Sequence, residues 1–344
     1  MKTFLTSFLF LFLATISTAQ EFKTPVDYLN YIGKESEIIS RTTWKYTTTV
    51  AHTKNARRID ASRKALIKSI QNATKKIEVL KDGYKGDVEY KNQLLAYLSI
   101  SEKYINEEYD KIIDMQEVAE QSYDYMEAYI MTRDLVNAKI NEEVDKLNAN
   151  QKIFANKYNI QIGEDTSELA KKMKISNEVF ENHTQLYLIF FKANFTESVL
   201  SKAIENKDIS AIQQNSNALE QYSNEGIEKL KTFKPYKNDM SLVLATKKYL
   251  EVSKKEALEL SPSVISFMML NQKFQESKKI MDNKSASNRS KEEVDTFNKL
   301  VNEVNKEVGN YNRTINKFNT DRTNAINNWN VTGDNFIARY VPID

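Results

Sequence analysis

The sequence predicts an all-α protein, built as an elongated bundle of long antiparallel helices with coiled-coil-like packing. Three observations support this fold class. Gly (7) and Pro (4) are scarce among 344 residues, against average usages of about 7% and about 5%. Turn-forming residues gather in a few short stretches. Between those stretches, apolar residues recur every three, four or seven positions, which is the spacing of one helix face.

The N-terminus, MKTFLTSFLFLFLATISTAQ, has the pattern of an export signal. Lys2 precedes an apolar run over 4–16, and small residues follow it. The run is shorter than the roughly 20 residues that a membrane-spanning helix needs. We therefore expect residues 1–19 to be a signal peptide, cleaved after Ala19 to leave Gln20 as the new N-terminus.

Four stretches with turn chemistry separate the expected helices: KDGYKGD (81–87), NIQIGED (159–165), FKPYKND (233–239) and DNKSASNRS (282–290). Helices are expected over about 26–81, 87–158, 166–233, 239–281 and 290–330. The stretch RTTWKYTTTVAHT at 41–53 is rich in β-branched residues and resembles a strand. No turn signal flanks it, so a helix is predicted there too.

The segment 87–158 contains neither Gly nor Pro. Its apolar residues form one stripe from Leu94 to Ile130. As one helix it would be roughly 100 Å long at 1.5 Å per residue. Such a helix must bury its stripe lengthwise against neighbours. At the other end of the chain, Ser290 and Glu293 have the spacing of a capping box. Gly333 and Pro342 are expected to end helical structure, leaving 331–344 as a tail packed on the bundle or docked on a partner.

Three pairs of similar segments suggest a tandem duplication of a helical unit of about 150 residues. Tyr-Lys-x-Asp occurs at 84–87 and 236–239, and YLSISEK (97–103) resembles YLEVSKK (249–255) at the same offset of 152. NEEVDKLN (141–148) resembles KEEVDTFN (291–298) at an offset of 150. Repeat 1 is then expected over 20–165 and repeat 2 over 166–330. The alternative is chance similarity among Lys/Glu-rich helices.

Composition and motifs argue against several function classes. Lys+Arg (49) nearly balance Asp+Glu (47), so no basic excess points to nucleic acid. Cysteine is absent and only two His occur, without HExxH or a Gly-rich phosphate loop. We therefore expect no catalytic residues, no metal and no cofactor. Without Cys there is no lipid anchor, and the apolar run at 186–191 is too short for a transmembrane helix.

Aromatic residues are the candidate contacts for a partner. Tyr90, Tyr97 and Tyr104 are spaced by seven along one helix flank, and Tyr rings suit sugars or proteins. The alternative is that these rings pack at the edge of the helix seam. Near the C-terminus, Phe336 and Tyr340 are candidates for docking on a partner.

Four blocks carry a resemblance to a family: EFKTPVDYLNYIGKE, LKDGYKGDVEYKNQLL, IDMQEVAEQSYDYMEAYI and NNWNVTGDNFIARYVP. With them, nearly the whole chain resembles uncharacterised surface proteins of spirochaetes and Bacteroidetes-type bacteria. The resemblance implies a long helical protein exported to the envelope or surface, and it implies no activity. The chain departs from this resemblance in one respect. It lacks the Cys that a lipid anchor needs, so we do not expect surface display through a lipid.

Two functions are weighed, both for an exported protein located in the periplasm or at the cell surface. The first is a non-enzymatic interaction or scaffold protein that contacts an envelope protein or glycan through its helix faces and aromatic tail. The second is a binding protein for a small molecule or glycan, with a Tyr-lined groove between helices. A buried carboxylate pair with a raised pKa in a cleft would instead favour an enzyme.

Overall fold

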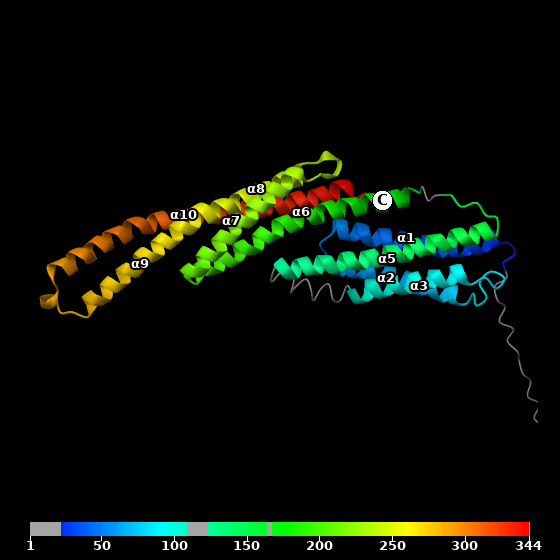
Figure 1. Cartoon of the computed structure of the whole chain (residues 1–344), viewed down its shortest axis with the longest axis horizontal. Coiled ribbons are helices and arrows are strands. Elements are labelled where there is room, and N and C mark those ends of the chain that lie inside the picture. The colour runs from blue at the N-terminus through cyan, green and yellow to red at the C-terminus, as the bar shows by residue number, and fades with distance from the viewer. Residues whose placement is uncertain (1–21, 109–122, 164–166, 344) are drawn as a thin grey trace, which may run out of the picture. The chain divides into compact units, whose positions relative to one another are not determined.

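The computed structural model describes residues 22–108, 123–163 and 167–343, and this part of the chain is all-α, as predicted, without a β-strand (Figure 1). The expected signal peptide and its cleavage site at Ala19 and Gln20 lie outside the described residues. The helices are α1 (Pro25–His52), α2 (Ala56–Glu78), α3 (Glu89–Lys103), η1 (Tyr104–Glu108), α5 (Tyr123–Lys157), α6 (Glu168–Glu205), α7 (Ile209–Thr232), η2 (Tyr236–Asn238), α8 (Ser241–Lys255), η3 (Glu256–Leu260), α9 (Ser261–Asp282), η4 (Ala286–Asn288) and α10 (Lys291–Tyr340).

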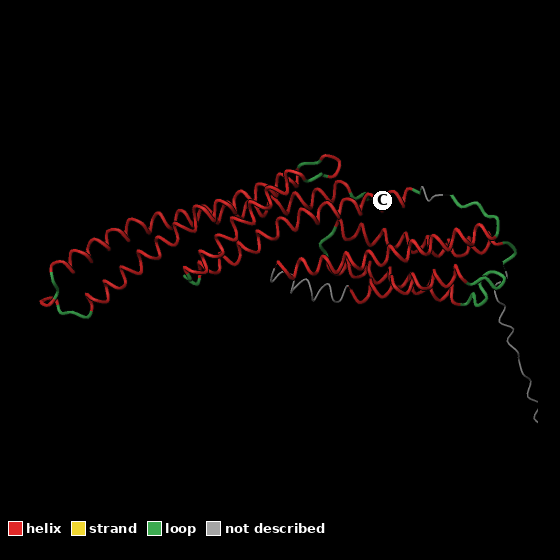
Figure 2. Tube along the Cα trace, in the orientation of Figure 1, coloured by secondary structure: helices red, strands yellow, loops and turns green. Residues whose placement is uncertain are grey.

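Contacts divide the chain into two compact units, and the helices that begin at Pro25, Ala56 and Tyr123 each have residues in both. Of the described residues, unit 1 comprises 22–43, 60–108 and 136–163, and unit 2 comprises 44–59, 123–135 and 167–343. In unit 1 the helices α1, α2, α3 and α5 run lengthwise beside one another (Figure 2). Its core contains an aromatic cluster at one end, formed by Tyr28, Tyr84, Tyr90 and Phe154.

The expected single helix over 87–158 is wrong. Lys157 Nζ, near the end of this segment, lies 2.8 Å from Asp87 Oδ2 at its start. The chain must therefore reverse direction between α3 and α5. Gln93 likewise donates to Glu143 at 2.8 Å. One straight helix would hold the ends of this segment roughly 100 Å apart. The absence of Gly and Pro therefore did not mean the absence of a reversal.

Two further expected helices are each interrupted by a short break. The expected helix 26–81 is broken at 53–55, where Asn55 Oδ1 accepts the Arg58 N–H at 3.1 Å. The expected helix 166–233 is broken at 206–208, where Asp208 Oδ1 accepts the Ala211 N–H at 3.0 Å. A side-chain oxygen that caps the next helix stabilises such a break without Gly or Pro.

The ambiguous stretch at 41–53 is helical, as predicted, and α1 continues to His52. The hydroxyls of Thr42, Thr43 and Thr49 donate to carbonyls four residues back, at 2.6–2.9 Å. Trp44 is buried in the core of unit 2. The β-branched residues therefore satisfy their hydroxyls within the helix.

Unit 2 packs α6, α7, α8 and α10 around one large apolar core, with Trp329 near its centre. The Trp329 ring stacks on Phe190 at a centroid distance of 4.2 Å, and its Nε1–H donates to Thr246 Oγ1 at 2.9 Å. The π-helix η3 joins α8 to α9 without a turn. α9 and the first half of α10 then extend past α7 as a two-helix hairpin (Figure 1).

The C-terminal segment does not leave the helix at Gly333, contrary to expectation. α10 begins at the predicted capping box of Ser290 and Glu293 and continues to Tyr340. A Cβ at position 333 would lie 3.1 Å from His183 Nε2. Gly333 therefore permits close packing of α10 against α6 and is not a helix stop.

The two Tyr-Lys-x-Asp turns share part of their local geometry, since the Asp N–H of each donates to the Tyr carbonyl, although 84–87 closes as a bridge and 236–238 is a 3-10 turn. Lys85 and Lys237 both adopt positive φ, at 51° and 47°. Each turn is followed by a 15-residue α-helix and then a 5-residue π-helix, α3 with η1 and α8 with η3. The equivalent boundaries all differ by the offset of 152 found in the sequence.

The Asp of each turn also has the same partners. Asp87 accepts from Lys157 Nζ at 2.8 Å and from the Tyr158 hydroxyl at 3.3 Å. Asp239 accepts from Arg339 Nη1 at 2.7 Å and from the Tyr340 hydroxyl at 3.0 Å. A basic residue followed by Tyr, at the end of a later helix, thus holds both turns. The Glu-Glu-Val-Asp blocks are not equivalent, since 142–145 lies inside α5 and 292–295 begins α10.

Candidate functional site

The tyrosines predicted to line a helix flank do not form an open contact surface. Tyr90 is 6% exposed and lies in the core of unit 1, where burial raises the pKa of its hydroxyl to about 12. Tyr97 and Tyr104 are half-buried on α3 and η1. The alternative weighed from the sequence, rings packed at a helix seam, describes Tyr90 best.

The aromatic residues of the expected tail also serve the fold. Phe336 is 1% exposed in the core of unit 2, so it is not available to a partner. Tyr340 is half-buried, packs edge-on against Tyr236 at 5.2 Å and donates to Asp239. These contacts hold the end of α10 on the 236–239 turn.

A groove of about 910 Å³ runs along α6 and α7 within unit 2. The α6 wall presents Glu178, Glu181, Asn182, Gln185, Leu188, Ile189 and Lys192. The other wall is formed by α7 and the segment after it, with Tyr222, Glu225, Gly226, Lys229, Thr232, Phe233, Lys234, Pro235, Tyr236 and Lys237. The groove thus combines aromatic rings with amide, carboxylate and ammonium groups.

Polar groups are held in fixed positions on both walls of the groove. Lys192 Nζ lies 4.0 Å above the centre of the Tyr222 ring and 3.1 Å from Glu225 Oε2. The pKa of Glu225 is lowered by hydrogen bonds from Gln221 and Lys192, so this carboxylate is an acceptor at neutral pH.

Asn182 offers an acceptor that the protein itself leaves unused. Its Nδ2 donates to the Lys234 carbonyl at 3.0 Å, which fixes the amide against the α7–α8 connection. Its Oδ1 is buried and has no hydrogen-bond partner within the described structure. A buried acceptor without a donor is unfavourable by about 1–3 kcal/mol.

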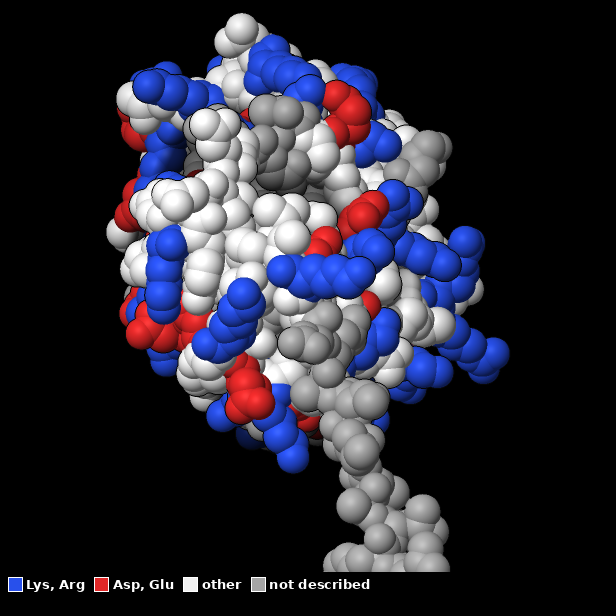
Figure 3. All heavy atoms as spheres, turned by 90° about the vertical axis from the view of Figure 1, so that its right-hand side faces the viewer, with Lys and Arg blue, Asp and Glu red and all other residues white. Residues whose placement is uncertain are grey.

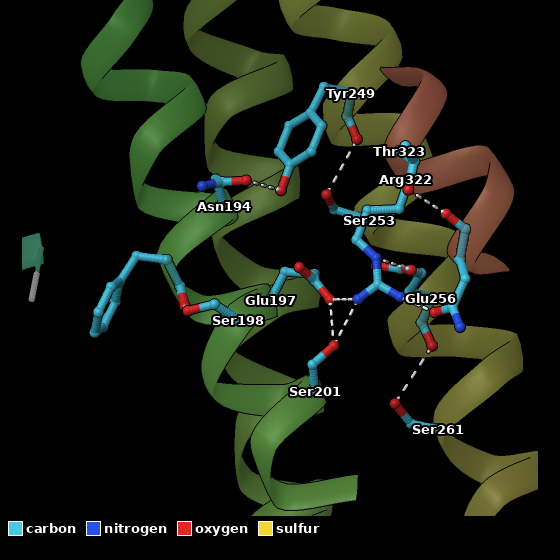
Figure 4. Close-up of polar contacts among 12 residues, drawn as sticks. Asn194, Glu197, Ser198, Ser201, Tyr249, Ser253, Glu256, Ser261, Arg322 and Thr323 are labelled. Carbon is cyan, nitrogen blue, oxygen red and sulfur yellow. Dashed lines mark hydrogen bonds and ion pairs between the residues drawn. The ribbon is translucent and has the colours of Figure 1, made fainter. Parts of the chain in front are cut away.

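A second polar site lies in the core of unit 2, where Glu197 of α6, Glu256 of η3 and Arg322 of α10 meet (Figure 4). Their side chains are 8%, 1% and 14% exposed. Arg322 Nη1 donates to Glu197 Oε1 and, at 2.5 Å, to Ser201 Oγ. Arg322 Nε lies 3.4 Å from Glu256 Oε1.

The guanidinium of Arg322 is oriented by these partners and by Asn319, which accepts from Nη2. Ser201 also donates to Glu197 Oε1 at 2.7 Å. Glu197 therefore has several partners, whereas neither carboxylate oxygen of Glu256 accepts a hydrogen bond in the described structure. The two carboxylates are unequal despite sharing one Arg.

The π-helix η3 positions Glu256. Its widened turn closes with the Ser261 N–H donating to the Glu256 carbonyl, and the Ser261 hydroxyl donates to the same oxygen at 3.3 Å. Pro262 follows, where a missing N–H disfavours a regular α-helical turn. Such π-turns inside helices are frequent at functional sites.

Burial raises the pKa of Glu256 to about 8, and the nearby Glu197 raises it further against the opposing effect of Arg322. Glu256 is therefore largely protonated at neutral pH. A small cavity of about 180 Å³ adjoins the site and is lined by both carboxylates, Arg322, Ser201 and Asn319. This is the buried carboxylate pair with a raised pKa that the sequence could not identify.

Sequence reasoning missed this site because its members are 59 to 125 positions apart and resemble many surface Glu and Arg residues. One local signal was available. Tyr249, Ser253, Glu256 and Leu260 recur at spacings of three or four and are all buried. A Glu at a core position of such a stripe indicates a buried carboxylate.

The end of unit 1 that carries the 79–88 turn presents many Lys and Arg side chains, with Asp and Glu between them (Figure 3). Lys81, Lys85 and Lys157 are exposed there. The carboxylates partly compensate this positive charge.

Within the described ranges, no helix has the length and apolarity to cross a membrane, and no three acidic or imidazole side chains gather as metal ligands.

Comparison of the chain with protein-family models, with curated proteins and with solved structures found no match.

Proposed function

We propose that the protein is an exported, non-enzymatic binding protein of a bacterial envelope, which takes a glycan in the groove between α6 and α7. The observation that carries this proposal is the groove itself, which has a volume of about 910 Å³ and aromatic residues beside amide, carboxylate and ammonium groups. Clefts of this size with a few fixed polar groups are the usual form of small-ligand sites.

Sugar rings combine apolar C–H faces with many hydroxyls. The rings of Tyr222, Phe233 and Tyr236 supply flat apolar surface along the α7 side of the groove. Glu225, whose pKa is lowered, supplies a carboxylate acceptor for hydroxyl groups. The groove therefore offers both kinds of contact that a glycan needs.

Binding fits the groove better than glycan hydrolysis does. A glycosidase needs one carboxylic acid with a raised pKa to protonate the leaving oxygen. The pKa of Glu225, which lines the groove, is shifted in the opposite direction. Glu256, whose pKa is raised, lines the separate small cavity.

Export and location form part of the proposal. The N-terminal pattern of residues 1–19 and the resemblance to bacterial surface proteins support secretion to the periplasm or cell surface. The proposal includes no lipid anchor, since the sequence contains no Cys. Binding to an envelope glycan would keep such a protein at the envelope.

The test is binding of the purified mature protein to an array of bacterial envelope oligosaccharides, followed by calorimetric titration of each positive. Tyr222→Ala removes a groove ring and should weaken binding at least about tenfold, or roughly 1–3 kcal/mol. Tyr125→Ala, at a site 56% exposed, should bind as the wild type does. Equal binding by both variants, or no binding by the wild type, would refute the proposal.

A second candidate, an interaction or scaffold protein, is favoured by the α9–α10 hairpin of unit 2. Met269, Ile280 and Val308 are 39–50% exposed on it. A two-helix arm with apolar residues on its surface suits contact with a partner helix. A photo-crosslinking amino acid in place of Ile280 should capture one envelope protein in cells. The same amino acid in place of Val79, which is exposed in the connection between α2 and α3, should not capture it.

We also propose that the chain contains a tandem duplication of about 150 residues. The matched turns, the equal lengths of α3–η1 and α8–η3, and the equivalent partners of Asp87 and Asp239 support it. The two repeats have diverged elsewhere. The position of repeat 1 that is equivalent to Glu256 is occupied by Tyr104. The Glu197–Glu256–Arg322 site then belongs to repeat 2 alone.

A further inference from the structure

Glu256 is the polar residue of unit 2 whose bonding is least complete. Its side chain is 1% exposed, and neither carboxylate oxygen accepts a hydrogen bond in the described structure. The nearest cation is Arg322, whose Nε lies 3.4 Å from Oε1. A buried carboxylate in this state is unfavourable unless it is protonated or acquires a further partner.

Arg322 does not neutralise both carboxylates. Its two terminal nitrogens donate to Glu197, Ser201 and Asn319. The site therefore holds two carboxyl groups and one guanidinium, which leaves one negative charge when both carboxyls are ionised. A second cation beside Glu256 would balance the charge.

The adjoining cavity has space for such a cation. It measures about 180 Å³, which is about six times the share of liquid volume that one water occupies. Its apolar lining is formed by Leu200, Ile204, Leu260 and Ile315. Glu256 lines it together with the polar groups of Glu197, Ser201 and Arg322. Glu205 and Asn319, both exposed, lie where the cavity reaches the surface.

We propose that this cavity binds a small primary amine, with the ammonium group paired to Glu256 and an aliphatic body of a few carbons against the apolar wall. The ammonium supplies three donors to the oxygens of Glu256, neither of which accepts a hydrogen bond in the described structure, although Oε1 lies 3.4 Å from Arg322 Nε. Glu197, Ser201, Asn319 and Arg322, which also line the cavity, already bond to one another. A ligand with an apolar body against the four aliphatic side chains therefore fits better than a hydrated metal ion. An anionic ligand would face two carboxylates across an Arg322 that already has partners.

The charged groups around Glu256 set the pH dependence of binding. Glu197 from α6 and Asp321 from α10 favour its protonated form, and Arg322 from α10 opposes them. Tyr249 from α8 stays neutral, because burial raises the pKa of its hydroxyl. The amine must displace the proton of Glu256, so affinity rises as the pH approaches and passes about 8.

The test uses n-butylammonium chloride with the purified full-length mature protein, followed by calorimetry and thermal denaturation. Binding should be roughly tenfold or more tighter at about pH 9 than at about pH 6, because Glu256 is then ionised. n-Butanol has the apolar body without the charge, and KCl has a cation without the body. Neither should raise the melting temperature as the amine does.

Two variants locate the site. Glu256→Gln should abolish amine binding, and Glu259→Gln, an exposed residue of the same π-helix, should leave it unchanged. Ile315→Phe, which fills the cavity and leaves Glu256 intact, should also abolish binding. Undiminished binding in both site variants, absence of binding in the wild type, or an equal response to KCl would overturn the proposal. None of these outcomes depends on the glycan groove.

Discussion

Glu256 places a carboxyl group in the core of unit 2, and its pKa makes a residue-scale prediction about stability. The pKa is raised from 4.5 to about 8, so the folded chain holds a proton that the unfolded chain releases above 4.5. The stabilisation that this bound proton gives is fully present below pH 4.5 and is lost as the pH rises through about 8. Stability should therefore fall with rising pH across this window.

Glu256→Gln removes this titration and keeps the shape of the side chain. The free energy of unfolding of the variant, relative to wild type, should rise by roughly 2–4 kcal/mol between about pH 5 and about pH 8. Urea denaturation at both pH values measures the difference, and subtraction cancels other titrating groups such as His183. A constant difference across the window would show that Glu256 is ionised in the fold throughout.

Glycines in long helices allow a second prediction at the residue scale. A Cβ on Gly226 of α7 would lie 2.8 Å from Leu250 Cδ1 and 3.1 Å from Ile189 Cγ2. Because Leu250 is fully buried, Gly226→Ala should lower the free energy of unfolding by about 1–3 kcal/mol. Gly309 of α10 has no neighbour within 4 Å, so Gly309→Ala should raise it by about 0.5–1 kcal/mol.

Thermal denaturation of these two variants provides the comparison, with the same substitution made in two helices of unit 2. Opposite signs are expected. Stabilisation by Gly226→Ala would mean that α7 does not approach α6 and α8 as closely as described.

At the scale of elements, the two Tyr-Lys-x-Asp turns should contribute about equally to the free energy of unfolding. Asp87 and Asp239 are 7% and 9% exposed and accept from a basic side chain and a Tyr hydroxyl. Burial opposes ionisation of both, but hydrogen bonds and the ion pairs lower the pKa of each carboxyl. Their stabilisation is present above the unfolded pKa of about 3.8 and is lost as the pH falls below it.

Asp87→Ala and Asp239→Ala should each lower the free energy of unfolding by about 1–3 kcal/mol near pH 7. Asp82→Ala, an exposed change in the first turn, should fall within about 0.5 kcal/mol of wild type. Denaturant titration of the three variants makes the comparison. An effect at one turn but not at the other would argue against equivalent roles.

The sequence predicted the fold class and the positions of the main turns, because scarce Gly and Pro make each turn stretch conspicuous. The breaks at 53–55 and 206–208 were missed, since a cap from Asn55 or Asp208 ends a helix without a turn motif. The reversal between α3 and α5 was missed because helical periodicity carries no information on direction. The triad around Glu256 depends on tertiary contacts that spacing along the chain does not contain.

At the scale of the whole molecule, export is the first prediction. The protein isolated from its cells should begin at Gln20, because the pattern of residues 1–19 is that of a cleaved signal. Intact-mass spectrometry measures this directly. If the isolated protein has the mass of the uncleaved chain of 344 residues, export by this signal is contradicted.

Treatment of intact cells with protease distinguishes the two proposed locations. Loss of the protein would indicate the cell surface, where we propose that a glycan or protein partner holds the chain. Protection until the outer membrane is breached would indicate the periplasm. Both outcomes agree with an envelope binding protein, and retention in the cytoplasmic fraction would not.

The central claim is that the groove between α6 and α7 is a binding site for an envelope glycan. Hydroxyl-radical footprinting of the mature protein, with and without a saturating envelope oligosaccharide, tests it most directly. Oxidation of Tyr222 and Tyr236, which line the groove, should fall severalfold, while that of Tyr125 stays constant. Unchanged oxidation of Tyr222 and Tyr236 under saturating glycan would contradict the claim.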